Sequence, residues 1–199
     1  MEADRYPFDL LEARRARNGR MILIRPILPD DERIVQAFVR NLSPRSRYQR
    51  FHNALKELSP ELLHRATHVD YDRHLALIAE TFDDGTETEI GAARYVLRRD
   101  GASADFALAV ADAWQRQGLG KALLEKLIAA ARERGLQRLE GEVLHDNRPM
   151  LTLAGKMGFR VHRHPEEARL FVVSRELHPA ADAFTPLRAT PANLAIAAA

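Results

Sequence analysis

One stretch decides the predicted fold of this chain of 199 residues: Val110-Ala111-Asp112-Ala113-Trp114-Gln115-Arg116-Gln117-Gly118-Leu119-Gly120-Lys121. The apolar residues that lead into it predict the end of a strand. The periodic apolar pattern that follows predicts a helix from about residue 118 to residue 134, which Gly135 ends. A strand that passes through a glycine-containing turn directly into a helix points several backbone N–H groups at one place.

Those N–H groups and the positive end of the helix dipole make such a turn a binding site for phosphate oxygens. Gly118 and Gly120 allow the backbone to approach a ligand without interference from a Cβ atom. Arg116 and Lys121 add positive charge. The stretch therefore predicts a phosphate-binding turn.

Two common nucleotide-binding motifs do not match this turn. A P-loop requires Ser or Thr after its lysine, whereas Ala122 follows Lys121. The dinucleotide-binding fingerprint requires a third glycine where Leu123 stands, and a parallel βαβ context. The pattern that fits is Gln/Arg-x-x-Gly-x-Gly/Ala, at residues 115–120.

The sequence around the turn predicts a mixed α/β (α+β) domain. Before the turn we expect a helix that Asp30 caps, and two short helices opened by Ser43-Pro44 and Ser59-Pro60. After it we expect a helix opened by Asn147. The predicted strands, with tight turns at Asp84-Gly85 and Asp100-Gly101, cover residues 21–25, 75–79, 90–97, 104–110, 139–144, 159–162 and 170–173. The three strands before the turn form a meander, which favours a mostly antiparallel sheet flanked by helices.

Composition divides the chain into three parts. Residues 1–19 are a charged N-terminal extension, expected to be largely solvated with at most a short helix. Residues 20–176 form the domain. Residues 177–199 contain nine alanines and three prolines, which predicts a flexible tail.

Several functional classes are disfavoured by composition. The chain has no cysteine, which excludes disulfides, thiolate metal sites and a cysteine nucleophile. A net charge of only +2 argues against nucleic acid, even with Arg45, Arg47 and Arg50 close together. We find no signal peptide and no apolar run long enough for a membrane span, so we expect a cytoplasmic protein.

Residues 115–120 resemble the turn of the GNAT superfamily of acyl-CoA-dependent N-acyltransferases, which holds the pyrophosphate of coenzyme A. Residues 147–159 look like that family's last helix and its following Gly-Phe. Residues 42–51, 68–72, 90–95 and 141–144 narrow the resemblance to the acyltransferase domain of bacterial protein lysine acetyltransferases, over residues 21–176.

The resemblance implies a single GNAT-like domain that transfers an acetyl group from acetyl-CoA to a primary amine, with a protein lysine as the suggested acceptor. It implies cofactor contacts at Leu108, Val110, Gln115, Arg116, Gln117, Gly118, Leu119, Gly120, Lys121 and Asn147. No acyl-cysteine can form, so transfer is expected to be direct, within one ternary complex.

Asp105 is the candidate general base, because the amine must lose a proton before it attacks. It precedes Val110 by five strand residues, about 16 Å, comparable to the reach of a pantetheine arm. The resembling group carries a glutamate here, so the shorter aspartate favours action through water. The alternative is an exposed acid at the end of a strand. Glu142 and Glu89 are further candidates for the base or for binding a cationic substrate; the alternative for each is a solvated or salt-bridged side chain.

Other features leave the function open. Many GNAT enzymes place a tyrosine where Ala154 stands, to protonate the leaving thiolate. This departure and the short Asp105 favour the alternative of a non-catalytic acyl-CoA-binding or sensor domain. His64 and His68 are four residues apart, but the sequence places no third ligand, so no metal site is predicted. The sequence predicts neither the acceptor nor the oligomeric state.

Overall fold

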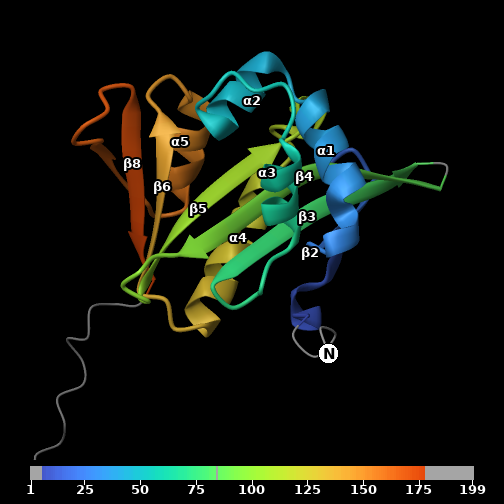
Figure 1. The fold of residues 1–199 in the computed structure, drawn as a ribbon, viewed down its shortest axis with the longest axis horizontal. Coiled ribbons are helices and arrows are strands. Elements are labelled where there is room, and N and C mark those ends of the chain that lie inside the picture. The colour runs from blue at the N-terminus through green and yellow to red at the C-terminus, as the bar shows by residue number, and fades with distance from the viewer. Residues whose placement is uncertain (1–5, 84, 178–199) are drawn as a thin grey trace, which may run out of the picture.

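The computed structural model describes residues 6–83 and 85–177. Within this part of the chain, one sheet of eight strands has the order β1-β2-β3-β4-β5-β6-β8-β7 (Figure 1). The strands are β1 (Glu12–Arg15), β2 (Met21–Pro26), β3 (His74–Asp83), β4 (Thr86–Leu97), β5 (Ser103–Val110), β6 (Arg138–Leu144), β7 (Arg160–Arg163) and β8 (Leu170–Glu176). All neighbours are antiparallel except β5 and β6, which are parallel. The predicted fold class is confirmed.

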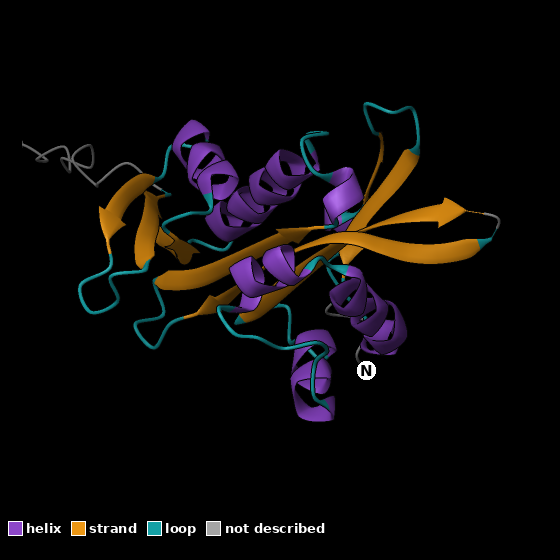
Figure 2. Cartoon of the chain, turned by 90° about the horizontal axis from the view of Figure 1, so that it is seen from above, coloured by secondary structure: helices purple, strands orange, loops and turns teal. Residues whose placement is uncertain are grey.

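Helices cover both faces of the sheet, and each face has its own apolar core (Figures 1 and 2). The helices are α1 (Glu32–Asn41), α2 (Pro44–Phe51), α3 (Pro60–Thr67), α4 (Leu119–Glu133) and α5 (Arg148–Lys156). The apolar stripe of α4 packs on one face, with Leu123, Leu124 and Leu127 fully buried. Side chains of α1 and α3 pack on the other face. The periodic patterns in the sequence correspond to these buried stripes.

Most predicted helix and strand starts agree with the structure to within one residue, but the start of α1 differs and β4 begins at Thr86, four residues before the predicted 90. Ser43 and Ser59 accept hydrogen bonds from the N–H groups of Ser46 and Leu62, as N-caps do. Asp30 does not cap α1, because residues Pro29–Asp31 form a 3-10 turn and the helix begins at Glu32. The turn at Gly101 has the expected positive φ of 68°. At the other tight turn Gly85 has a φ of 77°, and Asp84 lies outside the described residues.

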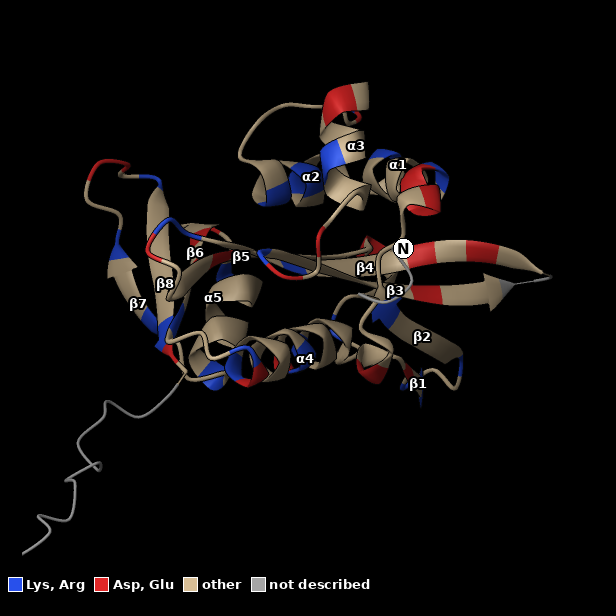
Figure 3. Cartoon of the chain, turned by 60° about the horizontal axis from the view of Figure 1, so that its bottom comes forward, with Lys and Arg blue, Asp and Glu red and all other residues tan. Residues whose placement is uncertain are grey.

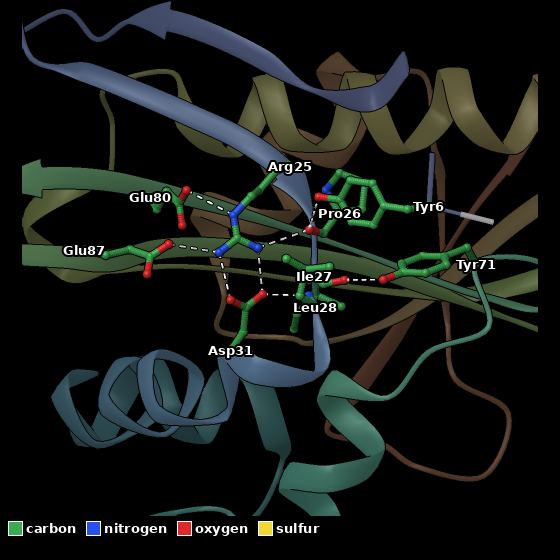
Figure 4. A network of polar contacts seen from close by, with 9 residues as sticks. All are labelled: Tyr6, Arg25, Pro26, Ile27, Leu28, Asp31, Tyr71, Glu80 and Glu87. Carbon is green, nitrogen blue, oxygen red and sulfur yellow. Dashed lines mark hydrogen bonds and ion pairs between the residues drawn. The ribbon is translucent and has the colours of Figure 1, made fainter. Parts of the chain in front are cut away.

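The acid that controls the start of α1 is Asp31, which is buried and bonded to Arg25 (Figure 4). The Arg25 guanidinium donates to both Asp31 oxygens at 2.7 and 2.8 Å, and to Glu80 and Glu87 at 3.0 Å each. Asp31 also accepts from the Leu28 N–H at 2.6 Å. The cluster therefore fixes α1 against β2, β3 and β4 through charge-assisted hydrogen bonds.

The N-terminal segment is more ordered than its composition predicted. Residues Phe8–Leu10 form a 3-10 turn whose Leu10 is buried in the core, and Glu12–Arg15 form β1, paired with β2. Expecting a solvated extension with at most a short helix was therefore wrong for these residues.

The first residue of the predicted tail also belongs to the folded part. Leu177 is buried, donates its N–H to Gln137 and accepts from the Arg132 side chain. Residues 178–199, the rest of the predicted tail, lie outside the described residues. Within the described part of the chain, no helix combines the length and the apolar character that crossing a membrane requires.

Candidate active site

The main feature of the sheet is the place where β5 and β6 separate. They pair only at Ser103 with Arg138, Ala104 with Leu139 and Asp105 with Glu140. Beyond this point β5 stays paired with β4 and β6 stays paired with β8. The sheet therefore splits into two parts that are joined over three residue pairs, and Figure 1 shows the two strands diverging.

Phe106 fills the closed end of this split. A Cβ atom placed on Gly141 would lie 2.8 Å from the Phe106 ring, closer than real Cβ contacts. Phe106 also packs against Phe159, with ring centroids 5.1 Å apart. Gly141 therefore lets an aromatic ring sit across the start of the opening, where a larger residue would displace it.

An inter-strand cavity of about 650 Å³ follows from the separation. This volume lies in the range of small-molecule sites. Its walls come from β5, β6, the start of α4, α5 along its length, and α2. The predicted cofactor residues that line it are Leu108, Val110, Gln115, Arg116, Gly118, Gly120, Lys121 and Asn147. Most of the residues predicted to contact the cofactor therefore lie in the wall of one cavity. That they bind acetyl-CoA remains a prediction.

Two predicted cofactor residues do not line the cavity. The Leu119 side chain is 3% exposed and belongs to the core. Gln117 turns back, and its amide donates to the Ala113 carbonyl at 2.8 Å. Any contact that these two residues make with a ligand would come through their backbone.

The turn before α4 has the geometry expected of an anion site. Arg116 and Gly118 have φ values of 59° and 89°, a backbone conformation that glycine adopts readily. The first hydrogen bond within the helix is donated by Ala122 to the Gly118 carbonyl. The N–H groups of Leu119, Gly120 and Lys121 precede it, and such groups have no partner inside a helix. They are the donors that an anion at this end would use.

Gly120 forms a cradle in the cavity wall. A Cβ atom here would lie 3.5 to 3.7 Å from Leu153, Val110 and Leu108, so even a methyl group would occupy cavity space. The donors at the turn, the glycine cradle and the long cavity fit a phosphate group with an extended arm. The residues present therefore fit acyl-CoA.

A hydrogen-bonded network ties α2 to the same turn. Asp112 accepts from the Ser43 N–H, the Ser43 hydroxyl and the Ser46 hydroxyl at 2.9, 2.8 and 2.7 Å. These bonds lower the pKa of Asp112, although partial burial opposes them. Gln115 donates to Ser46 and to the Val110 carbonyl, each at 3.2 Å. Neither Asp112 nor Ser46 was singled out as a site residue, because no local pattern reveals contacts 66 to 69 residues apart.

Positive charge reaches the cavity from two elements outside the motif. Arg17, in the turn between β1 and β2, and Arg50 of α2 both line it. Burial and the neighbouring Arg94 lower the pKa of Arg50, but a guanidinium remains charged at neutral pH. Figure 3 shows Lys and Arg along α2. The charged composition of residues 1–19 predicted a largely solvated extension, so Arg17 was not predicted at the cavity.

Asp105 lies at the apex of the split but is not among the residues that line the cavity. Its side chain is 59% exposed and accepts two hydrogen bonds from Arg98, at 2.9 and 2.5 Å. Arg98 also pairs with Glu140. The ion pair with Asp105 raises the pKa of Arg98. In this structure the candidate base is therefore occupied by a guanidinium.

The other candidate acids differ in position. Glu142 lines the cavity, is half exposed and lies 3.5 Å from His164. Glu89 is buried away from the cavity, and burial raises its pKa to about 8. Ala154 is fully buried on α5, and its methyl side chain supplies no acid for a leaving group. Asn147 caps α5 by accepting from the Met150 N–H.

Comparisons with known proteins agree with this architecture. Residues 38–159 match the model of the acetyltransferase (GNAT) family. The chain is 33% identical over 151 residues to acetyltransferase PA5475 of Pseudomonas aeruginosa, with 76% of this chain and 81% of that protein covered. It is 32% identical over 144 residues to acetyltransferase Pat of Mycolicibacterium smegmatis, covering 71% of this chain but 42% of that longer protein.

A solved structure shows the same fold. The GNAT domain of S. lividans PAT superposes with a TM-score of 0.77 at 30% identity, over 86% of this chain and 99% of that one. The resemblance to the acyltransferase domain of the bacterial protein lysine acetyltransferases is thereby confirmed. With the split sheet, the inter-strand cavity and the turn before α4 all present, this chain belongs to the GNAT acetyltransferase family.

Proposed function

We propose that this protein transfers an acetyl group from acetyl-CoA to a primary amine, with a protein lysine as the favoured acceptor class. The observation that carries the proposal is the inter-strand cavity, which runs along β5 and ends at the N-terminus of α4. A cavity with an anion site at one end and strand backbone along its length suits a phosphate-bearing thioester.

The residues of the turn would hold the phosphates. The N–H groups that open α4 would donate to the pyrophosphate, and Arg17, Arg116 and Lys121 would add positive charge. Leu108 and Val110 would lie along the pantetheine arm, and Asn147 would contact it from α5. These residues would place the thioester toward the closed end of the split, near Phe106.

The chemistry is attack of a neutral amine on the thioester carbonyl, which forms the amide and releases the CoA thiol. An ammonium with a pKa near 10.4 is neutral in about one molecule in a few thousand at pH 7, so a base is needed. Asp105 would remove the proton through a bridging water, once acceptor binding draws it away from Arg98. Because the chain has no cysteine, the acetyl group would pass directly to the amine.

A second function is favoured by two observations. Asp105 is engaged by Arg98, and Ala154 supplies no acid for the thiolate. A domain that binds acyl-CoA without turnover, as a sensor, would have both features.

The test is to mix the chain with acetyl-CoA and a panel of protein and small-molecule amines, and to measure free thiol. This chain has no cysteine and adds no thiol of its own, so with protein acceptors that also lack cysteine every thiol detected is a CoA thiol. We expect thiol release that depends on the acceptor, with the acetylated nitrogen identified by mass spectrometry. Calorimetric binding of CoA with no turnover over the whole panel would decide for the sensor.

A matched pair of variants tests the site itself. Gly120→Val fills the cradle between Leu153 and Val110 and should weaken CoA binding by at least about tenfold, while Gly155→Ala meets nothing within 4 Å and should bind as the parent does. No CoA binding by the parent, or equal binding by Gly120→Val, would contradict both proposed functions.

A further inference from the structure

A second cluster of chemically capable side chains lies on the helical layer that packs over the other face of the sheet. It consists of Glu32, the first residue of α1, of His64 on α3, and of His68, the residue that directly follows α3. One donor atom from each lies within 4.8 Å of the others. None of the three lines the inter-strand cavity. The sequence paired the two histidines but gave no third ligand, and the fold supplies it from a position 32 residues earlier in the chain.

The two imidazoles are held side by side. A spacing of four residues places them on one face of a helix, and their ring centroids are 3.6 Å apart with 30° between the planes. The Glu32 Oε1 atom lies 3.7 Å from His64 Nδ1 and 3.9 Å from His68 Nδ1. Both separations are too long for a hydrogen bond. The three side chains converge on one place without bonding to one another.

The contacts of His68 assign its tautomer. His68 Nδ1 lies 3.1 Å from the His64 carbonyl oxygen, which can only accept. It also lies 3.0 Å from the Thr67 hydroxyl, whose own proton is directed at the carbonyls of Leu63 and His64. Nδ1 therefore carries the hydrogen, and Nε2 keeps the lone pair and is the atom with which His68 would bind a metal. The 3.9 Å separation from Glu32 is measured to Nδ1, so it locates the His68 ring beside Glu32 and is not a distance between two ligand atoms. A backbone carbonyl that accepts from the second ring nitrogen is the usual support of a metal-bound histidine.

Two imidazoles and one carboxylate make a known zinc ligand set, with the fourth position open to water. Bonds of 2.0 to 2.2 Å in a tetrahedron place neighbouring ligand atoms roughly 3.3 to 3.6 Å apart. The 3.7 Å between Glu32 Oε1 and His64 Nδ1 is only slightly longer than this ligand-to-ligand distance. With side chains 44% and 62% exposed, Glu32 and His64 can rotate to close the gap, and an ion can enter with its water.

We propose that Glu32, His64 and His68 bind one Zn²⁺ ion, which joins the first turn of α1 to the end of α3. The ion would be held by one carboxylate and two neutral imidazoles, so its charge would be partly balanced at the site. Binding would fix two helices that pack against each other over the sheet face opposite α4. The site is separate from the proposed acetyl transfer, and it stands or falls independently of it.

The experiment is calorimetric titration of the full chain, stripped with a chelator and free of any histidine tag, with zinc chloride. We expect one equivalent to bind to the parent. Removing a residue that only hydrogen-bonds a metal ligand typically lowers metal affinity by about 10- to 100-fold. Removing a ligand itself should lower it by no less, so His64→Ala and Glu32→Gln should weaken zinc binding at least about tenfold. His162→Ala is the matched control, because this exposed imidazole lies on β7 beside Ser174.

Thermal unfolding gives a second readout. Zinc should raise the melting temperature of the parent and of His162→Ala, and should leave that of His64→Ala unchanged. Circular dichroism of each variant without metal shows whether it is folded. Absence of stoichiometric binding to the parent, or equal affinity of the parent and a folded His64→Ala, would overturn the proposal.

Discussion

Asp105 combines the position of a catalytic base with the contacts of a structural ion pair. It is the last residue of β5 that pairs with β6, directly before these two strands separate, and Arg98 holds its carboxylate. If the carboxylate accepts the proton of the amine, removing its charge should lower kcat strongly. Asp105→Asn should lower kcat by about 10²- to 10⁴-fold with little change in the KM for acetyl-CoA.

The role of the acid at residue 105 can be tested further by changing the length of its side chain. Asp105→Glu restores one methylene and should retain activity that Asp105→Asn loses, whereas Glu133→Gln, an exposed change at the end of α4, should have no effect. Steady-state kinetics with the best acceptor measure both constants. Near-parent turnover by a folded Asp105→Asn would exclude Asp105 as the base.

Gly141 is the residue on which the closed end of the split depends. An added methyl group would lie 2.8 Å from the Phe106 ring, so Gly141→Ala should destabilise the fold by about 1–3 kcal/mol. Gly155, in the helix α5, has open space around its missing Cβ, and Gly155→Ala should stabilise by about 0.5–1 kcal/mol. Urea unfolding compares the two variants, and equal effects would contradict the close packing of Phe106 on Gly141.

At the scale of elements, the network around Asp112 joins α2 to the phosphate-binding turn. Asp112→Asn removes charge and one of the two acceptor oxygens from three hydrogen bonds. If the displaced turn costs about 1–2 kcal/mol of the free energy of CoA binding, the affinity for CoA falls by about 5- to 30-fold. Calorimetry with CoA measures it, and Asp72→Asn, an exposed acid in the loop before β3, is the control.

A purely structural role for Asp112 would give a different result. In that case the variant would unfold at lower temperature but would bind CoA with unchanged affinity at temperatures where it is folded. A KM for acetyl-CoA that rises while kcat holds would instead assign Asp112 to positioning of the turn.

Elements with a strong local pattern could be predicted, and those that depend on distant partners could not. The helix α4 has an apolar stripe, a glycine before it and a glycine after it, so its bounds shifted by only one residue at each end. The strand β1 reads Glu-Ala-Arg-Arg and buries little, because backbone pairing with β2 holds it. No periodicity marks such a strand, so the sequence also gave no sign that Arg17 would reach the cavity.

In the candidate site, too, local features were predicted and contacts between distant parts of the chain were not. The turn at residues 115–120 is local, and most of its residues line the cavity as predicted. The contacts of Asp112 with α2, the pairing of Asp105 with Arg98, and the approach of Glu32 to the two histidines all depend on the folded chain. These are contacts between elements, which a single sequence does not encode in any short pattern.

At the scale of the whole molecule, buried acids make stability depend on pH. Burial raises the pKa of Glu89 to about 8 and that of Glu80 to about 7, from an ordinary value of 4.5. Between the ordinary and the raised value the folded protein holds a proton that the unfolded chain has lost. Stability from Glu89 is therefore full below about pH 4.5 and falls as pH rises to about 8.

Glu89→Gln replaces this carboxyl with a neutral group of similar shape. Its melting temperature relative to the parent should rise between pH 5 and pH 9, by at least about 3 °C, because the parent must ionise a buried group and the variant does not. Calorimetry at pH 5, 7 and 9 measures the trend. Glu61→Gln, an exposed change on α3, should run parallel to the parent. A difference that is constant over this range would contradict the assignment.

The separation of β5 from β6 also interrupts the hydrogen-bond ladder of the sheet. Past Asp105, and within the described residues, β5 has a ladder partner on one side only. A ligand with amide groups that lies along this side would act as a temporary strand. Its arrival should then appear as slower amide deuterium exchange in residues 106–110, while β3, paired on both sides, exchanges as before. Occupancy of the cavity can thus be followed from the backbone alone, with no reaction taking place.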